Sequence, residues 1–473
     1  MVKNKVCNIF CSFTAKKSEM DFFSGMKQMV ALWIMVLSVT TFVFSQTSDE
    51  EEKSEYEKRL DIIEFGLASE LTTLLNDLTK EKNDEFVTRF SEEFDKNKNS
   101  DVKEKILLYF MECDQNLKSD FVLNVLNTLE DQKNSMANLA FKYISHFKIQ
   151  EAGDRLRELI TNEDETFCDI AIRTLGKLGN GEDVTFLKEK FDDTTMALNM
   201  EDALIQAYGD LGSPETYDSL LAVAENEDKS PYLRIQSIEA LGKLGQPETV
   251  EKLALFYDSA DLRIRVATVK ALSNFSDSAA QELILGALKD NEVQVRLAAV
   301  QACSDQGIQS AVPMLLYRAK NDSDHNLRYR CYDALAKLGS DDGLNFLKKT
   351  VSNTKLNDTQ RVKAAEALLT HNFSAGASTV IDATLATLKE DRRKNLRYSL
   401  GKALAKHENA ALEDICRQFV THSDVATSVI GLDMYSKNRF ASVRGELEKM
   451  AAKERPSGAD KKAKSILERE KGN

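Results

Sequence analysis

Arginine recurs at one position of a repeating pattern, and its guanidinium is suited to bind carboxylates and phosphates through paired hydrogen bonds. The six arginines stand 31, 31, 32, 33 and 36 residues apart: Arg234, Arg265, Arg296, Arg328, Arg361 and Arg397. An aspartate precedes four of them by six residues: Asp228 and Arg234, Asp290 and Arg296, Asp322 and Arg328, Asp391 and Arg397. Because a buried charge needs a partner, we expect these aspartates to supply it. The row is then a structural ladder, with an anion-binding row as the alternative, favoured by additional basic residues at Arg263, Arg330 and 392–394.

Other residue types that carry chemistry do not form recognisable sites. His371 and His407 share one repeat position, but protein metal sites use three or four ligands and no cluster completes the set. The glycine-rich segment 176–181 lacks the order of a phosphate-binding loop. A serine nucleophile elbow and a His-Glu-x-x-His motif are also missing from the sequence. The chain is therefore predicted to be no enzyme and to hold neither a cofactor nor a metal.

The elements around the arginines repeat with them. Six residues after each arginine comes an alanine, and three successive units end in Gly179, Gly212 and Gly245. A glycine just past a helix end, followed by a proline or capping residue, stops one helix and starts the next. In one unit we expect helix A over 248–257 and helix B over 261–275. Self-similarity at this period predicts an all-α fold, an α-solenoid of ten to twelve stacked helical hairpins.

The pattern resembles HEAT repeats, a type of armadillo-like helical repeat, in the short bacterial form of phycobilisome lyases. The six-residue Asp-to-Arg interval and the ending Ala-Leu-Gly-Lys-Leu-Gly at 240–245 carry the resemblance, which is good over 165–408. It implies that the Asp and Arg pairs lie in turns and join one unit to the next. It implies little about function, because such arrays serve as scaffolds, adaptors, lyases and DNA-repair proteins. His407-Glu408 is similar to the His-Glu pairs of HEAT-repeat deoxyhypusine hydroxylases, but one pair does not support that activity.

The amino-terminal sequence predicts export. An uncharged apolar run over 29–44 follows Lys27 and precedes a polar, acidic segment. At this length it is short for a membrane-spanning helix and is typical of a secretory signal with cleavage near Ser45/Gln46. Met26 is then the expected start, and the protein is placed in the periplasm or cell envelope of a bacterium. The alternative is a membrane anchor through residues 29–44.

The predicted organisation has five parts. They are an amino-terminal extension and signal (1–45), a charged flexible lead-in (46–59), divergent helical repeats (60–160), the HEAT-like array (161–452) and a polar tail (453–473), which is expected to be frayed or to form one short helix. The five cysteines after the signal are too scattered for a disulfide framework. Cys303 and Cys331 are expected to be buried thiols, with a bridge between them as the alternative.

Binding is expected on helix B, which usually lines the concave face of such arrays. The net charge of −13 disfavours nucleic acid, so we expect protein partners, and a membrane only if the signal is retained. Candidate partner-binding residues lie five and nine positions after each arginine or are nearby aromatic and basic residues: Glu239, Lys243, Lys270, Gln301, Tyr329, Arg330, Asp333, Lys337, Tyr398, Lys402 and Lys406. The predicted function is a non-enzymatic scaffold or adaptor. The alternative is an exported accessory enzyme or lyase-like protein with a small ligand in the groove.

Overall fold

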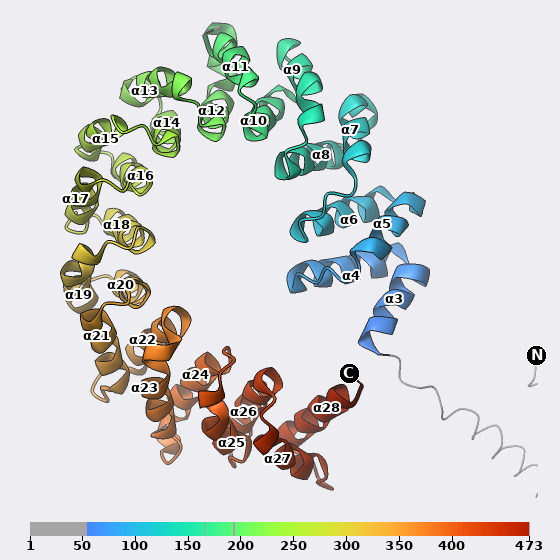
Figure 1. Ribbon diagram of the computed structural model, residues 1–473, viewed down its shortest axis with the longest axis vertical. Helices are drawn as coiled ribbons and strands as arrows, with labels where there is room; N and C mark the ends of the chain where they lie inside the picture. The colour runs from blue at the N-terminus through green and yellow to red at the C-terminus, as the bar shows by residue number, and fades with distance from the viewer. Residues whose placement is uncertain (1–53, 165, 193, 473) are drawn as a thin grey trace, which may run out of the picture. The chain divides into compact units, whose positions relative to one another are not determined.

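The computed structural model describes residues 54–164, 166–192 and 194–472. Within these ranges the chain is 78% helical, with 26 α-helices and no strands, which confirms the all-α class (Figure 1). The apolar run over 29–44, the expected start at Met26 and the predicted cleavage site lie outside the described residues. None of the described helices is both long enough and apolar enough to cross a membrane.

Contacts divide the chain into two compact units, Met1–Asp77 and Leu78–Asn473. In the first, helix α3 (Glu55–Phe65) begins earlier than the repeats were predicted to begin, within the segment expected to be flexible. Its start is fixed by a capping box, in which the Ser54 side chain accepts from the Glu57 N–H and the Glu57 carboxylate accepts from the Ser54 N–H. Helix α4 (Ala68–Glu81) runs across the division between the units.

The second unit is a succession of helical hairpins. The first helices of the hairpins, called helices A, are α5 (Val87–Lys96), α7 (Ser119–Asn127), α9 (Gly153–Thr161), α11 (Glu182–Asp192), α13 (Tyr217–Glu225), α15 (Thr249–Tyr257), α17 (Ser278–Ala287), α19 (Val312–Asn321), α21 (Asp341–Ser352), α23 (Phe373–Leu385), α25 (Glu413–Val420) and α27 (Ala441–Ala451). The second helices, called helices B, are α6 (Ser100–Glu112), α8 (Asn134–Phe147), α10 (Cys168–Leu178), α12 (Thr194–Leu211), α14 (Pro231–Leu244), α16 (Leu262–Leu272), α18 (Val293–Asp305), α20 (His325–Leu338), α22 (Asp358–His371), α24 (Lys394–Leu404), α26 (Val425–Asn438) and α28 (Gly458–Gly472). Short 3-10 turns precede several helices: η1 (Leu129–Asp131), η2 (Gln150–Ala152), η3 (Pro214–Thr216), η4 (Gln309–Ala311), η5 (Asp391–Arg393) and η6 (Ala410–Leu412).

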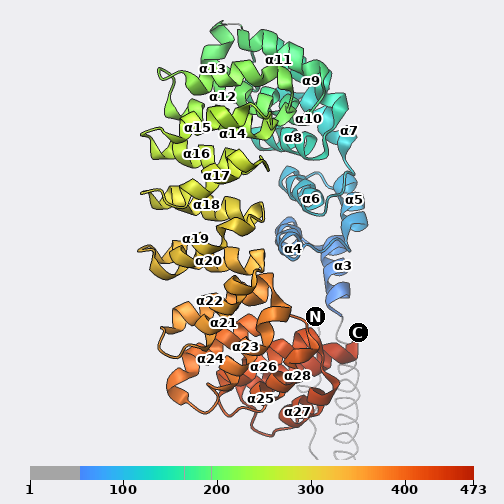
Figure 2. The same cartoon turned by 60° about the vertical axis from the view of Figure 1, so that its left-hand side comes forward.

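Each helix B from α10 onward packs on the next helix B, and most also pack closely on the helix A of their own hairpin. Figures 1 and 2 show the resulting rows, with the helices B of the second unit in one layer and the helices A in the other. The predicted helices at 248–257 and 261–275 correspond to α15 and α16, so the period gave the element order and most of the boundaries.

Small residues set the distance between helices B. A Cβ built on Gly176 would lie 2.5 Å from the Cα of Ala207, and one on Gly242 would lie 2.8 Å from the Cα of Ala271. The recurring alanine therefore occupies the contact between neighbouring helices B, where a larger side chain would overpack the interface. Gly179 and Gly245 end their helices with positive φ angles of 76° and 66°, as the glycine stops predicted.

The carboxy-terminal tail is more ordered than a frayed segment. We expected 453–473 to be frayed or to form one short helix, and most of it forms α28, which packs on α26 and α27. Ala459, Ala463 and Leu467 are buried at four-residue intervals, the spacing of one helix face. The Asp460 carboxylate accepts from the Ser457 N–H at 2.8 Å, while the Asp460 N–H donates to the Ser457 hydroxyl at 3.3 Å. The cap and the row of apolar residues are short and lie among many charged residues, so the sequence pattern did not reveal them.

Candidate functional site

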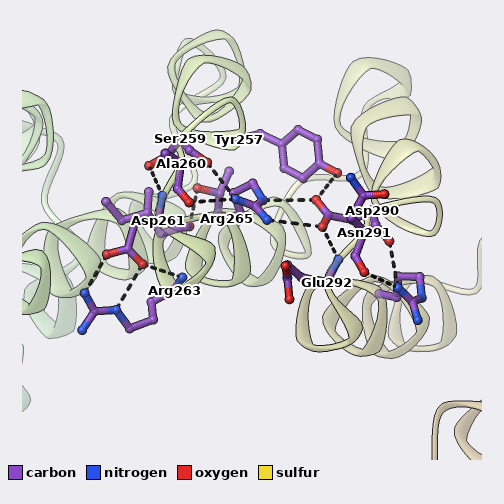
Figure 3. A network of polar contacts seen from close by, with 12 residues as sticks. Tyr257, Ser259, Ala260, Asp261, Arg263, Arg265, Asp290, Asn291 and Glu292 are labelled. Atoms are coloured by element: carbon purple, nitrogen blue, oxygen red, sulfur yellow. Dashed lines mark hydrogen bonds and ion pairs between the residues drawn. The ribbon is translucent and has the colours of Figure 1, made fainter. Parts of the chain in front are cut away.

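The arginine ladder is present, but its connections differ from those predicted. Arg265 Nε donates to Asp290 Oδ2 at 3.1 Å and Nη2 donates to Asp290 Oδ1 at 3.4 Å (Figure 3). Arg265 Nη1 donates to the carbonyls of Ser259 and Ala260 at 2.9 and 3.2 Å. The Tyr257 hydroxyl also contacts Asp290, at 3.2 Å. A single guanidinium thus holds its own turn and the aspartate of the next unit.

Arg296 repeats this arrangement in the next unit, where the ion pair is more deeply buried. Arg296 and Asp322 are 6% and 3% exposed, and Arg296 donates to the Asp322 carboxylate from Nε at 3.0 Å and from Nη2 at 2.9 Å. Arg296 Nη1 donates to the carbonyls of Asp290 and Asn291, both at 2.9 Å. Burial alone would raise the pKa of Asp322, but the hydrogen bonds and charges of Arg296 and Arg318 outweigh it and lower that pKa.

These contacts correct the predicted partner. The aspartate six residues before Arg296 supplies its carbonyl oxygen, and the carboxylate comes from the following unit. No ion pair joins Asp228 to Arg234, Asp322 to Arg328 or Asp391 to Arg397 anywhere in the described ranges. The reason is geometric: an arginine in the first turn of helix B covers the preceding A–B turn and extends sideways to the neighbouring turn.

The other arginines at this repeat position have fewer hydrogen-bond partners or partners of a different kind. Arg234 Nε, Arg361 Nε and Arg397 Nη1 each donate to a carbonyl ten residues back, at 3.0, 2.8 and 3.1 Å. Arg397 also donates to the Thr427 hydroxyl at 2.8 Å and lies 3.7 Å from Asp424. Arg328 contacts the His325 ring.

The sequence analysis did not predict the Arg157–Asp183 ion pair or Asp424 as a partner of Arg397. Arg157 Nη1 lies 2.5 Å from the buried carboxylate of Asp183, in the next hairpin. Arg157 is on a helix A, outside the register of the six arginines, so the period could not reveal it. Asp424 lies beyond the region of clear self-similarity.

The predicted partner-binding positions on helix B largely pair with one another. Opposite charges at equal repeat positions meet across adjacent helices: Lys243 and Asp210 at 2.8 Å, Lys270 and Glu239 at 3.8 Å, Lys337 and Asp305 at 2.8 Å. The Gln301 amide donates to Asp305 at 2.8 Å. These side chains therefore form exposed ion pairs between α12 and α14, between α14 and α16 and between α18 and α20, and their charge is neutralised by neighbours.

The pairing stops at α20, α22 and α24, where the surface is hollowed. A cavity of about 340 Å³, called the B-layer hollow below, is lined by Tyr329, Asp333, Lys363, Glu366, Leu369, Thr370, Ala403, Lys406 and His407. Asp333 and Glu366 occupy equal repeat positions, so two acids replace the acid–base pairing of the other rungs. Within the described part of the chain, Lys402 and Lys406 form no ion pair through their side chains.

Electrostatics in the hollow are mixed. Lys363 Nζ lies 2.7 Å from Glu366, while Arg330 lies 4.0 Å from Asp333. Burial raises the pKa of Asp333, and burial together with the charges of Lys437 and Lys406 lowers the pKa of His407. The lining thus offers acids and an amine on α20 and α22, together with the Lys406 amine and the His407 imidazole just past α24.

The aromatic candidates have different environments. Tyr329 lines the hollow and its ring centroid lies 5.8 Å from that of Tyr332, which is buried. The Tyr398 hydroxyl donates to Asp424 at 3.0 Å, so Tyr398 belongs to the arginine ladder more than to a free surface. The large exposed aromatics among the described residues are Tyr56, Phe65, Tyr232 and Tyr317, none of which was a predicted candidate.

The cysteines of the described chain are free, and no disulfide joins Cys303 to Cys331. Burial raises the pKa of both thiols to about 12. No cluster of three His, Cys, Asp or Glu side chains suited to a metal ion occurs among the described residues.

Similarity to solved structures is broad and remote. The complex of CpcE and CpcF of phycocyanin lyase from a Nostoc species shows 18% identity over 54% of this chain and 95% of that chain, with a TM-score of 0.33. Kap121p shows 13% identity over 99% of this chain, with a TM-score of 0.40, and the match spans 57% of its length. Human deoxyhypusine hydroxylase shows 20% identity over 55% of this chain and 96% of that chain, with a TM-score of 0.25. A search of curated proteins finds no match.

The family assignment comes from the sequence match. A model described as spirochaete HEAT repeat protein matches residues 63–466 and so spans nearly all of the helices described above. With its arrayed hairpins, glycine stops and unit-to-unit arginine bonds, the chain belongs to the spirochaete HEAT repeat protein family.

Proposed function

We propose that the protein is a non-enzymatic scaffold that binds another protein through the B-layer hollow and the lysines beside it. The observation that carries this proposal is that, within the described chain, no ion pair between surface side chains on neighbouring helices B involves α22 or α24. Between α12 and α20 three pairs of opposite charges at equal repeat positions neutralise each other. Among the described residues, Lys402 on α24 and Lys406 just past it have no acidic side-chain partner. Unpaired charges around a preformed hollow can provide the polar rim of an interface.

The hollow suits an extended segment of a partner better than a reacting substrate. Its acids and amines come from α20, α22 and the segment just past α24, and they are not arranged as a nucleophile with its base. A partner side chain entering between Tyr329 and His407 would meet apolar contact from Leu369 and Ala403, with charges at the rim. We propose that the partner carries acidic groups opposite Lys402 and Lys406.

Photo-crosslinking in an envelope extract tests this proposal. A photoreactive residue at Thr370 in the hollow is compared with one at Leu255, which is exposed on helix α15 in the other layer. We expect one or two dominant adducts from Thr370 and none of the same mass from Leu255. Equal adducts from both positions, or none from Thr370, would contradict binding at the hollow.

A charge test gives a matched control. Lys402→Glu with Lys406→Glu reverses the lysines beside the hollow, while Lys349→Glu reverses an exposed lysine on α21. The double variant should lose the adduct and Lys349→Glu should retain it. Retention in both would show that the lysines do not contribute.

The second candidate function is an accessory protein that holds a small ligand in the same hollow. The cavity volume of about 340 Å³ favours it, because this is the size of a small-molecule site. Native mass spectrometry of protein purified from the envelope distinguishes the two, since a retained small molecule without a protein adduct would favour the ligand. The envelope location is itself a proposal, supported by the apolar run over 29–44.

A further inference from the structure

Arg361 differs from Arg296 and Arg397, the other buried arginines of the ladder, because it forms no ion pair among the described residues. It lies in the first turn of α22 and is 3% exposed. Its Nε donates to the Val351 carbonyl at 2.8 Å, but its buried Nη1 has no hydrogen-bond partner among the described residues. Arg397 Nη2 also lacks a hydrogen bond, but it lies 3.7 Å from Asp424. A buried charged donor without a partner is costly, so Arg361 has unused capacity to bind an anion.

The missing partner can be located by comparison with the complete rungs. The acid that pairs with Arg265 lies 25 residues after it, and the acid that pairs with Arg296 lies 26 residues after it. Counting 26 residues from Arg361 leads to Thr387, just past α23. Thr387 is buried and its hydroxyl donates to the Thr384 carbonyl at 2.6 Å. Arg265 and Arg296 have a carboxylate at this place, whereas Arg361 has a hydroxyl that is already engaged.

A second cation lies near this gap. The A–B turn between α23 and α24 contains η5, which ends at Arg393. Burial and the nearby charge of Arg393 lower the pKa of Arg361, and Asp358 only partly offsets them. The Arg393 side chain is 26% exposed and its Nε lies 3.1 Å from Glu390 on the same turn. One guanidinium is therefore buried with a free donor, and a second can be reached from solvent.

We propose that an oxyanion, the carboxylate or phosphate group of a ligand, binds between Arg361 and Arg393 and takes the place of the missing aspartate. The buried Nη1 would donate to one oxygen, while Arg393 would turn from Glu390 to a second oxygen. Guanidinium groups bind both kinds of oxyanion through fixed, paired donors. The alternative occupant is a water molecule, which would satisfy Nη1 without adding charge.

Hydrogen exchange of the full chain tests the site, with inorganic phosphate and acetate as probes and chloride to match ionic strength. At a probe concentration of roughly ten times Kd, local opening that releases the ion should become about tenfold rarer. We expect about tenfold slower exchange in α22 and in residues 386–396, with α14 unchanged. A response to phosphate alone or to acetate alone identifies which oxyanion the site prefers.

Three variants distinguish the site from general effects of salt. Arg393→Ala should abolish the response, and Arg392→Ala, at an adjacent position that is 80% exposed, should retain it. Thr387→Asp supplies an internal carboxylate, so it should slow exchange in α22 without a probe and remove the response to one. If Thr387→Asp does not fold, Arg393→Ala still decides the question. Equal protection of wild type and Arg393→Ala, or no protection of wild type, would overturn the proposal and favour a bound water.

Discussion

Replacing Arg296 with alanine provides a direct test of how the units are joined. The change removes two hydrogen bonds to the Asp322 carboxylate and two to backbone carbonyls. Asp322 is 3% exposed and would keep only Arg318, at 3.3 Å, as a charged partner. Removing one member of a buried pair costs about 3–5 kcal/mol, and the remaining partner places the expected loss near the lower end, about 3 kcal/mol.

A double-mutant cycle separates this pairing from the one suggested by the sequence. Arg296→Ala is combined with Asp322→Asn in one cycle and with Asp290→Asn in another. We expect a coupling of about 1–3 kcal/mol in the first cycle and about 0.5 kcal/mol or less in the second, because only the carbonyl of Asp290 contacts Arg296.

The assay is urea denaturation followed by circular dichroism, with hydrogen exchange over α18 and α20 because arrays do not always unfold in two states. Arg234→Ala is the matched control, since Arg234 is bonded only to a carbonyl and should cost about 1 kcal/mol. Equal coupling in the two cycles, or a similar loss for Arg234→Ala and Arg296→Ala, would refute the proposed linkage between units.

Two further predictions rest on the structure and a third on the sequence. The pKa of Asp322 is lowered from 3.8, so its contribution to stability is present above that pH and is lost as pH falls through the lower folded value; acid titration of Asp322→Asn should show a smaller loss than wild type. Gly242→Ala should destabilise the protein by about 1–3 kcal/mol, because its Cβ would lie 2.7 Å from the Ala271 Cβ, whereas Gly286→Ala has open space and should be neutral or stabilising in thermal melts. Mass spectrometry of the mature protein should find Gln46 at the amino terminus, and a retained apolar segment would contradict cleavage.

The repeat was readable from sequence because each unit must satisfy the same local requirements. Helix ends are marked by Gly179 and Gly245, and close contacts between helices are marked by Ala240 and Ala271. Each of these two features depends on one residue type. Their spacing therefore gave the class of fold and the limits of α15 and α16.

Connections between units were harder to predict. A six-residue interval fixes where Asp290 and Arg296 lie in the repeat, but it does not say toward which neighbour a long side chain extends. The exposed ladder could have been foreseen, since Lys243 and Asp210 have opposite charges at equal positions. The hollow could not, because it depends on how three helices B are spaced.

Arg265 and Arg296 each bind the aspartate of the following hairpin, and this affects how unfolding and mechanical force spread along the chain. Each complete rung ties one hairpin to the next, so disruption of a single hairpin is resisted by its neighbour. Among the described residues, Arg234, Arg328 and Arg361 provide no such tie to the following hairpin. Arg361 is the buried one of the three, and the hairpins that contain α22 and α24 rely on apolar contact. We expect cooperative unfolding to divide at the joints that lack the tie. Any ligand that bridges such a joint would merge the two segments into one mechanical element.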